Sequence, residues 1–516
     1  MRWTTTAGGL FAALLSTAAL TACGEADKTT TSGADASSKT SSTSESSAPA
    51  QSDATLRVSI PGDIDNFDPY TNQLIQYEWA LRNTVFNTLV RYDADLKIVA
   101  DLGEATANED ATEFSFALRD GVKFSDGEPL DATAVISSLK AAAKSKGVYA
   151  SRLAGVKSYA APDPQTVVLT LKSPEAAFLD GLTHIAIVAP DHLKTARKKP
   201  VGSGPYTFVS WTPNSEIVLK RNPSYFGTKA PFAEIVLKPI ADEQVALNDL
   251  YAGDLDVLGS ATTSTVKQVD KARADVVTPT SSNSISLIEY GYGPLVQKPV
   301  LRQALGYALD RDAIKKIAFG DEGESVWSPL PTGSWAYKEE AGYPLDLDKA
   351  KELVSQAGAT GKTITFDILS GTTEATQLGR VWQQSLAKAG IKLKIRTSEL
   401  SVWLDRYVNR KYDVIYNYFN VSSDPHSFFD VIMKPHLQDN YKNPEMTKLI
   451  AEGISTSDEA ARKETYAKLQ DMMVKDLPVM TVQSRPLAAV TSKQVSGVVL
   501  NPLGWPLFDT AKPAGA

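Results

Sequence analysis

Few side chains in this sequence could perform covalent chemistry. There are only four histidines, at positions 184, 192, 426 and 436, and no His-Glu-x-x-His motif that would supply zinc ligands from one helix. Residues 201–205 read Val-Gly-Ser-Gly-Pro, which lacks both outer glycines of a Gly-x-Ser-x-Gly nucleophile elbow. No glycine-rich phosphate-binding loop follows a predicted strand. The sequence therefore predicts a protein that is not an enzyme and has no cofactor, with a secreted hydrolase as the remote alternative.

The single cysteine, Cys23, follows a short apolar segment. An uncharged stretch begins after Arg2, and its apolar part, 10–20, is shorter than the roughly 20 residues that cross a bilayer. A short apolar segment after a basic start is typical of a secretion signal. The stretch ends in Leu-Thr-Ala-Cys, which resembles a bacterial lipobox, where the cysteine thiol accepts a lipid. We therefore predict a signal peptide over 1–22 and a lipidated, palmitate-bearing Cys23.

The segment that follows Cys23 is predicted to be a disordered tether. Residues 24–54 contain no Val, Ile, Leu, Met or aromatic residue and are rich in Ser, Thr and Ala. Such a segment buries too little apolar surface to offset its chain entropy. A lipid on Cys23 and a tether over 23–54 would hold an extracytoplasmic body at the outer face of the cell membrane.

The composition limits what that body can be. A chain of 516 residues is long enough for two or three domains. It has 53 Lys and Arg against 60 Asp and Glu, a net charge of −7, whereas a nucleic-acid binder would carry a basic surface. We expect no nucleic-acid partner and a monomer.

Strands and helices alternate from Thr55 onward. Strands are predicted at 56–60, 114–118, 167–171 and 217–219, with a hairpin turn at Asp120-Gly121 leading to 122–124. Asp131 is the predicted N-cap of a helix over 134–139. In the second half, helices at 301–309, 348–357 (capped by Asp348) and 377–389 alternate with strands at 364–369, 391–395 and 412–419. This order predicts an α/β fold with a partly parallel sheet.

Seven segments, taken in order, resemble those of family 5 solute-binding proteins of ABC importers, which serve dipeptides, oligopeptides and nickel. These segments are 85–93, 114–130, 201–208, 221–227, 251–257, 301–311 and 412–413 leading to 424–425. The resemblance covers roughly 55–510. It implies a two-lobed, periplasmic-binding-protein-like fold (type II, cluster C) with a hinge and an extra subdomain in the first lobe. It also implies that a solute is enclosed between the lobes and delivered to an ABC permease in the membrane.

The resemblance also implies domain boundaries. The first lobe would comprise 55–288, including a subdomain at about 80–200, and the chain would return to it at 484–510 before a tail at 511–516. The second lobe would comprise 289–483. The hinge strands would pass near 286–290 and 481–484.

The ligand is expected to be a peptide or a similar small organic solute. In peptide binders of the family, an aspartate of the second lobe pairs with the peptide ammonium group. The matching position here is Val421 or Ser422, and neither is a carboxylate. The arginine that holds the carboxyl end in dipeptide binders has no match at Thr376 or Gln377. Aromatic faces with a few polar groups can replace such anchors. The expected ligand-binding residues are Tyr418, Phe419, Asn420, Trp403, Trp79, Tyr70 and His426.

A metal chelate is the alternative ligand on the same scaffold. In nickel- and metallophore-binding relatives, an Asp-Pro-His at the place of Asp424, Pro425 and His426 contributes an imidazole that faces the metal. No metal site is predicted beyond this candidate, His426.

Overall fold

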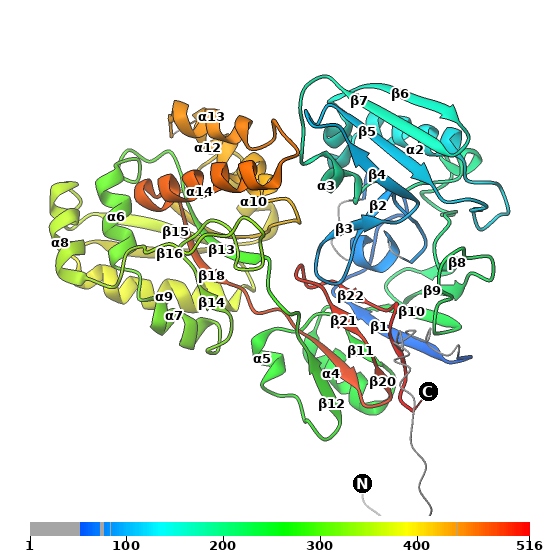
Figure 1. Ribbon diagram of the computed structural model, residues 1–516. Helices are drawn as coiled ribbons and strands as arrows, with labels where there is room; N and C mark the ends of the chain where they lie inside the picture. The colour runs from blue at the N-terminus through cyan, green and yellow to red at the C-terminus, as the bar shows by residue number, and fades with distance from the viewer. Residues whose placement is uncertain (1–51, 73–76, 83, 440, 516) are drawn as a thin grey trace, which may run out of the picture. The chain divides into compact units, whose positions relative to one another are not determined.

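The computed structural model describes residues 52–72, 77–82, 84–439 and 441–515 of the chain. The predicted signal peptide, Cys23 and the tether up to residue 51 lie outside these residues. The described residues belong to one compact unit. Within the described ranges, no helix has the length and apolar character that a membrane crossing requires. The unit contains two sets of sheets, which we call lobe I (52–277 and 489–515) and lobe II (284–484) (Figure 1).

A seven-stranded sheet forms the base of lobe I, in the order β12-β19-β11-β1-β10-β9-β8. Its strands are β1 (Thr55–Ile60), β8 (Tyr206–Thr212), β9 (Glu216–Arg221), β10 (Glu234–Pro239), β11 (Val257–Leu258), β12 (Ala274–Val277) and β19 (Ala489–Ser492). The predicted strand at 56–60 is the central β1, which is parallel to both of its neighbours. Its alternating Leu56, Val58 and Ile60 are buried in the core of lobe I. The short helices beside the seven-stranded sheet are α4 (Glu243–Ala252) and α5 (Thr263–Val266).

A four-stranded antiparallel sheet, β4-β5-β7-β6, is the second large sheet of lobe I. Its strands are β4 (Gly103–Ala107), β5 (Glu113–Leu118), β6 (Val156–Asp163) and β7 (Thr166–Leu171), beside the β2 (Val90–Tyr92) and β3 (Ile98–Ala100) pair. The helices here are η1 (Glu78–Arg82), α2 (Ala132–Lys144), η2 (Val148–Leu153), α3 (Phe178–Leu182) and η3 (Pro190–His192). Asp131 caps α2 as predicted, since its carboxylate accepts a hydrogen bond from the amide of Ala134 (2.9 Å).

The predicted hairpin at Asp120-Gly121 is wrong. Gly121 does adopt a positive φ of 69°, as a turn requires, but β5 is already flanked by β4 and β7. Residues 122–124 instead close a local loop, in which the amide of Phe124 donates to the carbonyl of Glu128 (2.9 Å). Both edges of β5 are occupied, so the segment after the turn has no edge to pair with.

Lobe II is built on a six-stranded sheet in the order β14-β18-β13-β17-β15-β16. The strands are β13 (Ser284–Tyr290), β14 (Glu324–Ser325), β15 (Thr363–Leu369), β16 (Lys392–Ser398), β17 (Val414–Asn420) and β18 (Val479–Ser484). The helices are α6 (Pro299–Tyr307), α7 (Arg311–Ala318), α8 (Leu347–Gln356), α9 (Thr373–Lys388), α10 (Leu400–Val408), α11 (His426–Phe428), η4 (Phe429–Met433), α12 (Lys434–Asp439), α13 (Pro444–Glu452) and α14 (Glu459–Asp476). β15 is parallel to β16 and to β17, which confirms the partly parallel sheet.

Two helix starts in lobe II differ from the predictions. Asp346, and not Asp348, caps α8 by accepting from the amide of Lys349 (2.8 Å). Asp346 and Asp348 are equally suited by residue type to cap a helix, so the sequence alone does not show which of them is the N-cap. The backbone geometry decides between them. α9 begins at Thr373, before the predicted 377. Ala375 in its first turn is buried three positions before Leu378, so the buried face of the helix starts earlier than the prediction placed it.

The chain crosses between the lobes twice. It leaves lobe I after β12 and enters lobe II at β13, and it returns from β18 to β19. β13 and β18 are antiparallel neighbours, so the crossings at 278–283 and 485–488 leave the same part of the sheet. The expected hinge segments 286–290 and 481–484 lie inside these paired strands. Among the described residues, each hydrophobic core cluster draws on one lobe only. The short strands β20 (Val495–Ser496), β21 (Val499–Leu500), β22 (Pro506–Leu507) and β23 (Lys512–Pro513) complete lobe I.

Candidate functional site

A group of polar and aromatic side chains gathers where lobe II meets the crossings. Ser284 of β13 lies opposite Asn420 of β17 in the sheet register. The amide of Arg485, the first residue after β18, donates to the carbonyl of Ser284 (2.7 Å). The backbone thus brings the ends of three strands together beside both crossings.

Arg485 connects this group to helix α9. Its guanidinium carbon lies 4.2 Å from the centre of the Tyr418 ring, and its Nη2 lies 3.1 Å from Oε1 of Glu374 in the first turn of α9. Burial alone would lower the pKa of Arg485, but Tyr416 and Glu374 raise it above its ordinary value. The guanidinium therefore stays charged, with one carboxylate and one aromatic face beside it.

Several buried polar atoms of this region have no hydrogen-bond partner among the described residues. They are Oδ1 of Asn283, Oδ1 of Asn420 and Nε of Arg485. Buried polar groups in proteins are normally hydrogen-bonded, so these three atoms mark a region where hydrogen-bond partners are missing. Together they offer two acceptor oxygens and one donor nitrogen.

The structure brings two of the expected ligand-binding residues, Tyr418 and Asn420, to this site and turns Phe419, which lies between them, away from it. Tyr418 is 46% exposed and contacts Arg485. Phe419 points to the other side of β17, where its ring lies 6.0 Å from that of Phe428, edge to face. Asn420 is half-buried and contributes its free Oδ1. Strand alternation thus divides the predicted run between the site and the core.

The other expected ligand-binding residues lie elsewhere. Trp403 on α10 is only 8% exposed and stacks on Tyr407 with ring centres 5.1 Å apart, and its Nε1 has no partner in the described part of the chain. Tyr70 is buried in lobe I, where its hydroxyl donates to the carbonyl of Ala186 (3.2 Å). Trp79 belongs to η1, but its side chain lies outside the described structure.

His426 starts α11 and is buried, with 7% of its surface exposed. Burial lowers its pKa to about 4, so the imidazole is neutral at physiological pH. Its Nδ1 has no hydrogen-bond partner among the described residues. No group of three or more His, Cys, Asp or Glu side chains is placed to hold a metal ion within those residues.

Sequence reasoning missed Arg485 and Glu374. Arg485 directly follows the expected hinge strand, and Glu374 precedes the predicted start of its helix at 377. The pair is 111 residues apart in sequence, and neither residue belongs to a recognisable motif. The position of Arg485, a basic residue at the end of a predicted hinge strand, was the signal that could have identified it.

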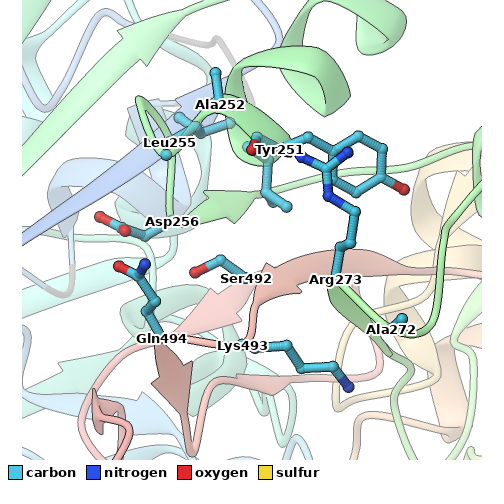
Figure 2. Close-up of a pocket in the computed structure, with 11 residues that line it drawn as sticks. Tyr251, Ala252, Leu255, Asp256, Ala272, Arg273, Ser492, Lys493 and Gln494 are labelled. Atoms are coloured by element: carbon cyan, nitrogen blue, oxygen red, sulfur yellow. Dashed lines mark hydrogen bonds between the residues drawn. The ribbon is translucent and has the colours of Figure 1, made fainter. Parts of the chain in front are cut away.

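A separate cavity of about 300 Å³ lies in lobe I, between the C-terminal end of α4 and the end of β19 (Figure 2). Its charged side chains are already engaged. Asp256 pairs with Arg57 (2.9 Å), and the guanidinium of Arg273 lies 4.2 Å from the centre of the Tyr251 ring. None of the expected ligand-binding residues lines it.

The lobes touch on the side of the four-stranded sheet. The amide of Ala176 in lobe I donates to the carbonyl of Ile454 in lobe II (3.0 Å), and the amide of Ser457 donates to the carbonyl of Glu109 (3.3 Å). The hydroxyl of Ser422 donates to Oδ2 of Asp180 (2.7 Å). The structure is therefore a conformation in which lobe I and lobe II are in contact.

A family model and a known protein match this chain in sequence. The model of the bacterial extracellular solute-binding proteins, family 5 (middle region), matches residues 97–437. A probable D,D-dipeptide-binding periplasmic protein of Escherichia coli K12 is 27% identical over 454 residues, which cover 83% of this chain and 88% of the relative.

Solved structures show the same architecture. An ABC transporter substrate-binding protein of Listeria monocytogenes superimposes with a TM-score of 0.82 at 21% identity, covering 89% of this chain and 99% of the other. The Brucella suis protein NikA, solved with Fe(III)-EDTA, gives a TM-score of 0.80 at 22% identity, covering 89% of this chain and all (100%) of the other. At such identities the likeness establishes the two-lobed fold.

Proposed function

Because this chain belongs to family 5 of the bacterial extracellular solute-binding proteins, we propose that it captures a peptide or similar small organic solute between its lobes and delivers it to an ABC import permease. The observation that carries this proposal is the group formed by Tyr418, Asn420, Arg485 and Glu374 beside the crossings. The dipeptide named for the Escherichia coli relative supports a peptide as the first ligand to test.

The site formed by Arg485, Glu374 and Asn420 is suited to a solute that carries both a carboxylate and an ammonium group. Arg485 can receive a carboxylate, and Glu374 can receive an ammonium group, since their side chains are paired and only partly exposed (23% and 20%). A zwitterion that separates this pair replaces one ion pair by two. The free Oδ1 of Asn420 can then accept an N–H of the solute. These residues take the place of the anchors that Val421, Ser422, Thr376 and Gln377 do not provide.

Capture requires no covalent step. A solute that contacts both lobes stabilises the closed conformation by the difference between its affinities for the closed and open forms. The two short crossings are the natural hinge, because each lobe keeps its own hydrophobic core when they bend. The permease would then distinguish the closed protein from the open one.

The location is part of the proposal. Lipidated Cys23 would hold the protein at the outer face of the cell membrane, with the tether between lipid and lobe I. The described chain is attached to lobe I from its start, since the amide of Ser52 donates to the carbonyl of Pro231 (2.8 Å). We further propose that the protein acts as a monomer and that Trp403, Trp79, Tyr70 and His426 contribute to the ligand site when the lobes move.

Identification of the bound solute is the direct test. Mature protein purified under native conditions would be denatured, and the released small molecules analysed by mass spectrometry. We expect a peptide or another small zwitterion in stoichiometric amount, whose readdition raises the melting temperature. Chemical turnover of the readded solute, or release of a solute without any charged group, would contradict the proposal.

A metal chelate is the second candidate, since the free Nδ1 of the buried His426 could face a metal and NikA was solved with an iron chelate. Metal analysis of the purified protein separates the two. Nickel- or zinc-dependent thermal stabilisation that disappears in His426→Ala would favour the chelate, and unchanged stabilisation would exclude this role.

A further inference from the structure

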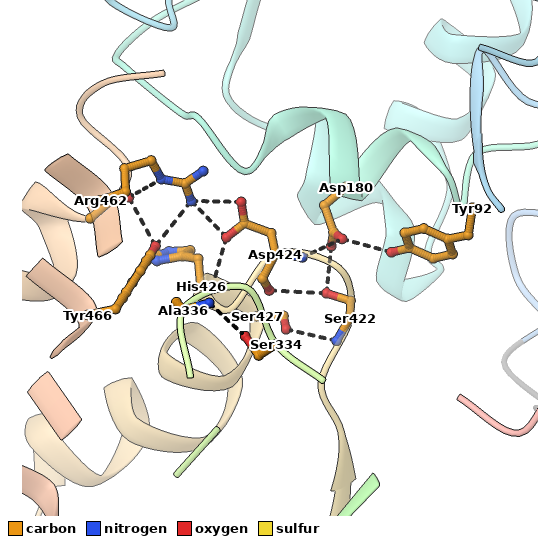
Figure 3. Close-up of polar contacts among 11 residues, drawn as sticks. Tyr92, Asp180, Ser334, Ala336, Ser422, Asp424, His426, Ser427, Arg462 and Tyr466 are labelled. Carbon is orange, nitrogen blue, oxygen red and sulfur yellow. Dashed lines mark hydrogen bonds and ion pairs between the residues drawn. The ribbon is translucent and has the colours of Figure 1, made fainter. Parts of the chain in front are cut away.

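Asp180 is a buried carboxylate at the contact between the lobes. It lies on α3 of lobe I and is only 3% exposed. Within lobe I it accepts a hydrogen bond from the hydroxyl of Tyr92 (2.8 Å). From lobe II it accepts one from the hydroxyl of Ser422 (2.7 Å) and one from the amide of Asp424 (3.1 Å) (Figure 3). One carboxylate thus holds donors from both lobes.

The lobe II side of this contact is held firmly. Both carboxylate oxygens of Asp424 accept from Nη2 of Arg462 on α14 (2.8 and 2.7 Å). The Nε of Arg462 donates to the carbonyl of Gly453 (2.7 Å), next to the segment that meets Ala176 of lobe I. Figure 3 shows this chain of contacts from Arg462 through Asp424 to Asp180 and Tyr92. Movement of α14 relative to lobe I must therefore break the bonds to Asp180.

The charges around Asp180 oppose one another. The negative charge of Asp424 acts on Asp180, and Asp424 is itself paired with Arg462 (2.7 Å). Five further titratable groups face this region: Glu175 before α3, Arg152 of η2, His184, His426 of α11 and Asp430 of η4. The side chain of Arg152 packs against Gly181, and the ring of His184 lies 6.0 Å from that of Tyr92. Burial lowers the pKa of both histidines, so neither supplies a positive charge. Asp180 is consequently buried against the backbone amide of Asp424, whose own carboxylate is paired with Arg462.

We propose that Asp180 is a proton-sensitive latch: its carboxylate joins the lobes, and its protonation favours the joined conformation over the separated one. The latch deepens the proposed capture of a solute between two lobes, on which it rests. It assigns to Asp180 a positioning role in closure, without contact to the solute. Separation of the lobes would return Asp180 to water and remove the bonds from Ser422 and Asp424.

The direction of the pH effect follows from the two environments. Burial first, and the charge of Asp424 second, raise the pKa of Asp180 to about 6 in the joined conformation. Exposed to water, the same carboxyl would titrate near its ordinary value of 3.8. The joined form therefore binds the proton more tightly, so it gains stability as the pH falls through 6 and loses that gain as the pH rises. Between about pH 7.5 and pH 5 the ratio of joined to separated molecules should rise about tenfold.

The test measures the distance between the lobes without any solute. Spin labels on Lys157→Cys in lobe I and Lys448→Cys in lobe II, both exposed positions, report that distance by pulsed electron paramagnetic resonance, in a full mature chain that carries Cys23→Ser. We expect the short-distance population of solute-depleted protein to increase at about pH 5. Asp180→Asn should give a large short-distance population at both pH values, because the amide oxygen still accepts from Asp424 and no charge is buried.

Two further variants keep the test independent of folding. Ser422→Ala removes one of the two bonds from lobe II and should reduce the short-distance population, whereas Tyr92→Phe removes the bond within lobe I and should preserve the pH response. A wild-type distance distribution that does not change with pH, or an Asp180→Asn variant that responds to pH like the wild type, would overturn the latch. Because no solute is present, failure of the proposed solute capture would appear separately, as an absence of bound solute after purification.

Discussion

The guanidinium of Arg485 lies over the ring of Tyr418 at 4.2 Å, so a residue of the crossing segment covers an aromatic side chain of the lobe II sheet. Glu374 holds the guanidinium from a third element, α9. Three parts of the chain that are distant in sequence therefore meet at one charged, partly exposed point.

Removal of either charge at this point should weaken binding of the copurified solute. Charge-assisted hydrogen bonds contribute about 1.5–3 kcal/mol, so we expect Arg485→Ala and Glu374→Ala to raise the Kd by roughly tenfold to a hundredfold. Isothermal titration calorimetry measures this. Lys448→Ala, which removes an exposed ion pair on α13, is the matched control and should bind like the wild type. Unchanged affinity in both site variants would remove the pair from the ligand site.

Tyr418 should act through its ring and not through its hydroxyl. Tyr418→Phe keeps the face that contacts Arg485 and should bind the solute normally, whereas Tyr418→Ala should weaken binding. Because the side chain is 46% exposed, we expect both variants to retain the melting temperature of the wild type within a few degrees. Equal loss of affinity in both variants would instead assign the contact to the hydroxyl group.

Glu289 should make lobe II sensitive to acid. It is completely buried and accepts from Nε2 of His436 (3.0 Å), from Asn417 (2.9 Å) and from Arg410 (3.3 Å). Burial alone would raise the pKa of Glu289, but these partners lower it below its ordinary value. Its stabilising effect is therefore present above the pKa of the unfolded chain and is lost as the pH falls through the folded value.

Urea unfolding at neutral and acidic pH measures this effect. Glu289→Gln should reduce the free energy of unfolding at neutral pH by about 3–5 kcal/mol, because it leaves Arg410 without its buried partner. The difference between wild type and variant should shrink in acid. A difference that is constant with pH would contradict the charge-based explanation.

Gly202 should be needed for folding and not for binding. A Cβ atom at this position would lie 2.2 Å from the carbonyl oxygen of Val85, so two of the segments that identify the family pack directly against each other. We expect Gly202→Ala to lower the free energy of unfolding by about 1–3 kcal/mol or more. Gly155→Ala, where a Cβ meets nothing within 4 Å, is the control. Normal stability with lost binding in Gly202→Ala would assign this segment to the ligand site.

Cys23 should decide where the protein resides. Cys23→Ser removes the thiol that would accept the lipid, so the protein should leave the membrane fraction and incorporate no labelled palmitate. Fractionation and labelling of cells that express the two forms measure this. A serine variant that stays with the membrane would place the anchor elsewhere.

Local sequence patterns predicted helices and strands well where no distant strand competed for the same pairing edge. The alternation of Leu56, Val58 and Ile60 gave β1, and Asp131 gave the start of α2. The turn at Gly121 was also recognised, but its pairing was not, because β4 and β7 come from other parts of the chain. Local sequence reports a turn, whereas long-range pairing decides which strand edge is free.

The candidate site was predicted in part for a similar reason. Tyr418, Phe419 and Asn420 were predicted from the family resemblance, and the two-residue period of β17 explains why Phe419 packs against Phe428 instead. Arg485 and Glu374 meet only through the return of the chain along β18, which single-sequence patterns do not encode. The Asp180 contact joins residues 242 positions apart and was inaccessible for the same reason.

Arg485 is the first residue of the returning crossing, so a ligand that binds its guanidinium would also act on the hinge between the lobes. Binding of the solute and bending of the hinge would thus depend on the same residue. A solute that contacts the aromatic surface but not this arginine would bind without stabilising the closed conformation. The permease would then not distinguish the occupied protein from the empty one.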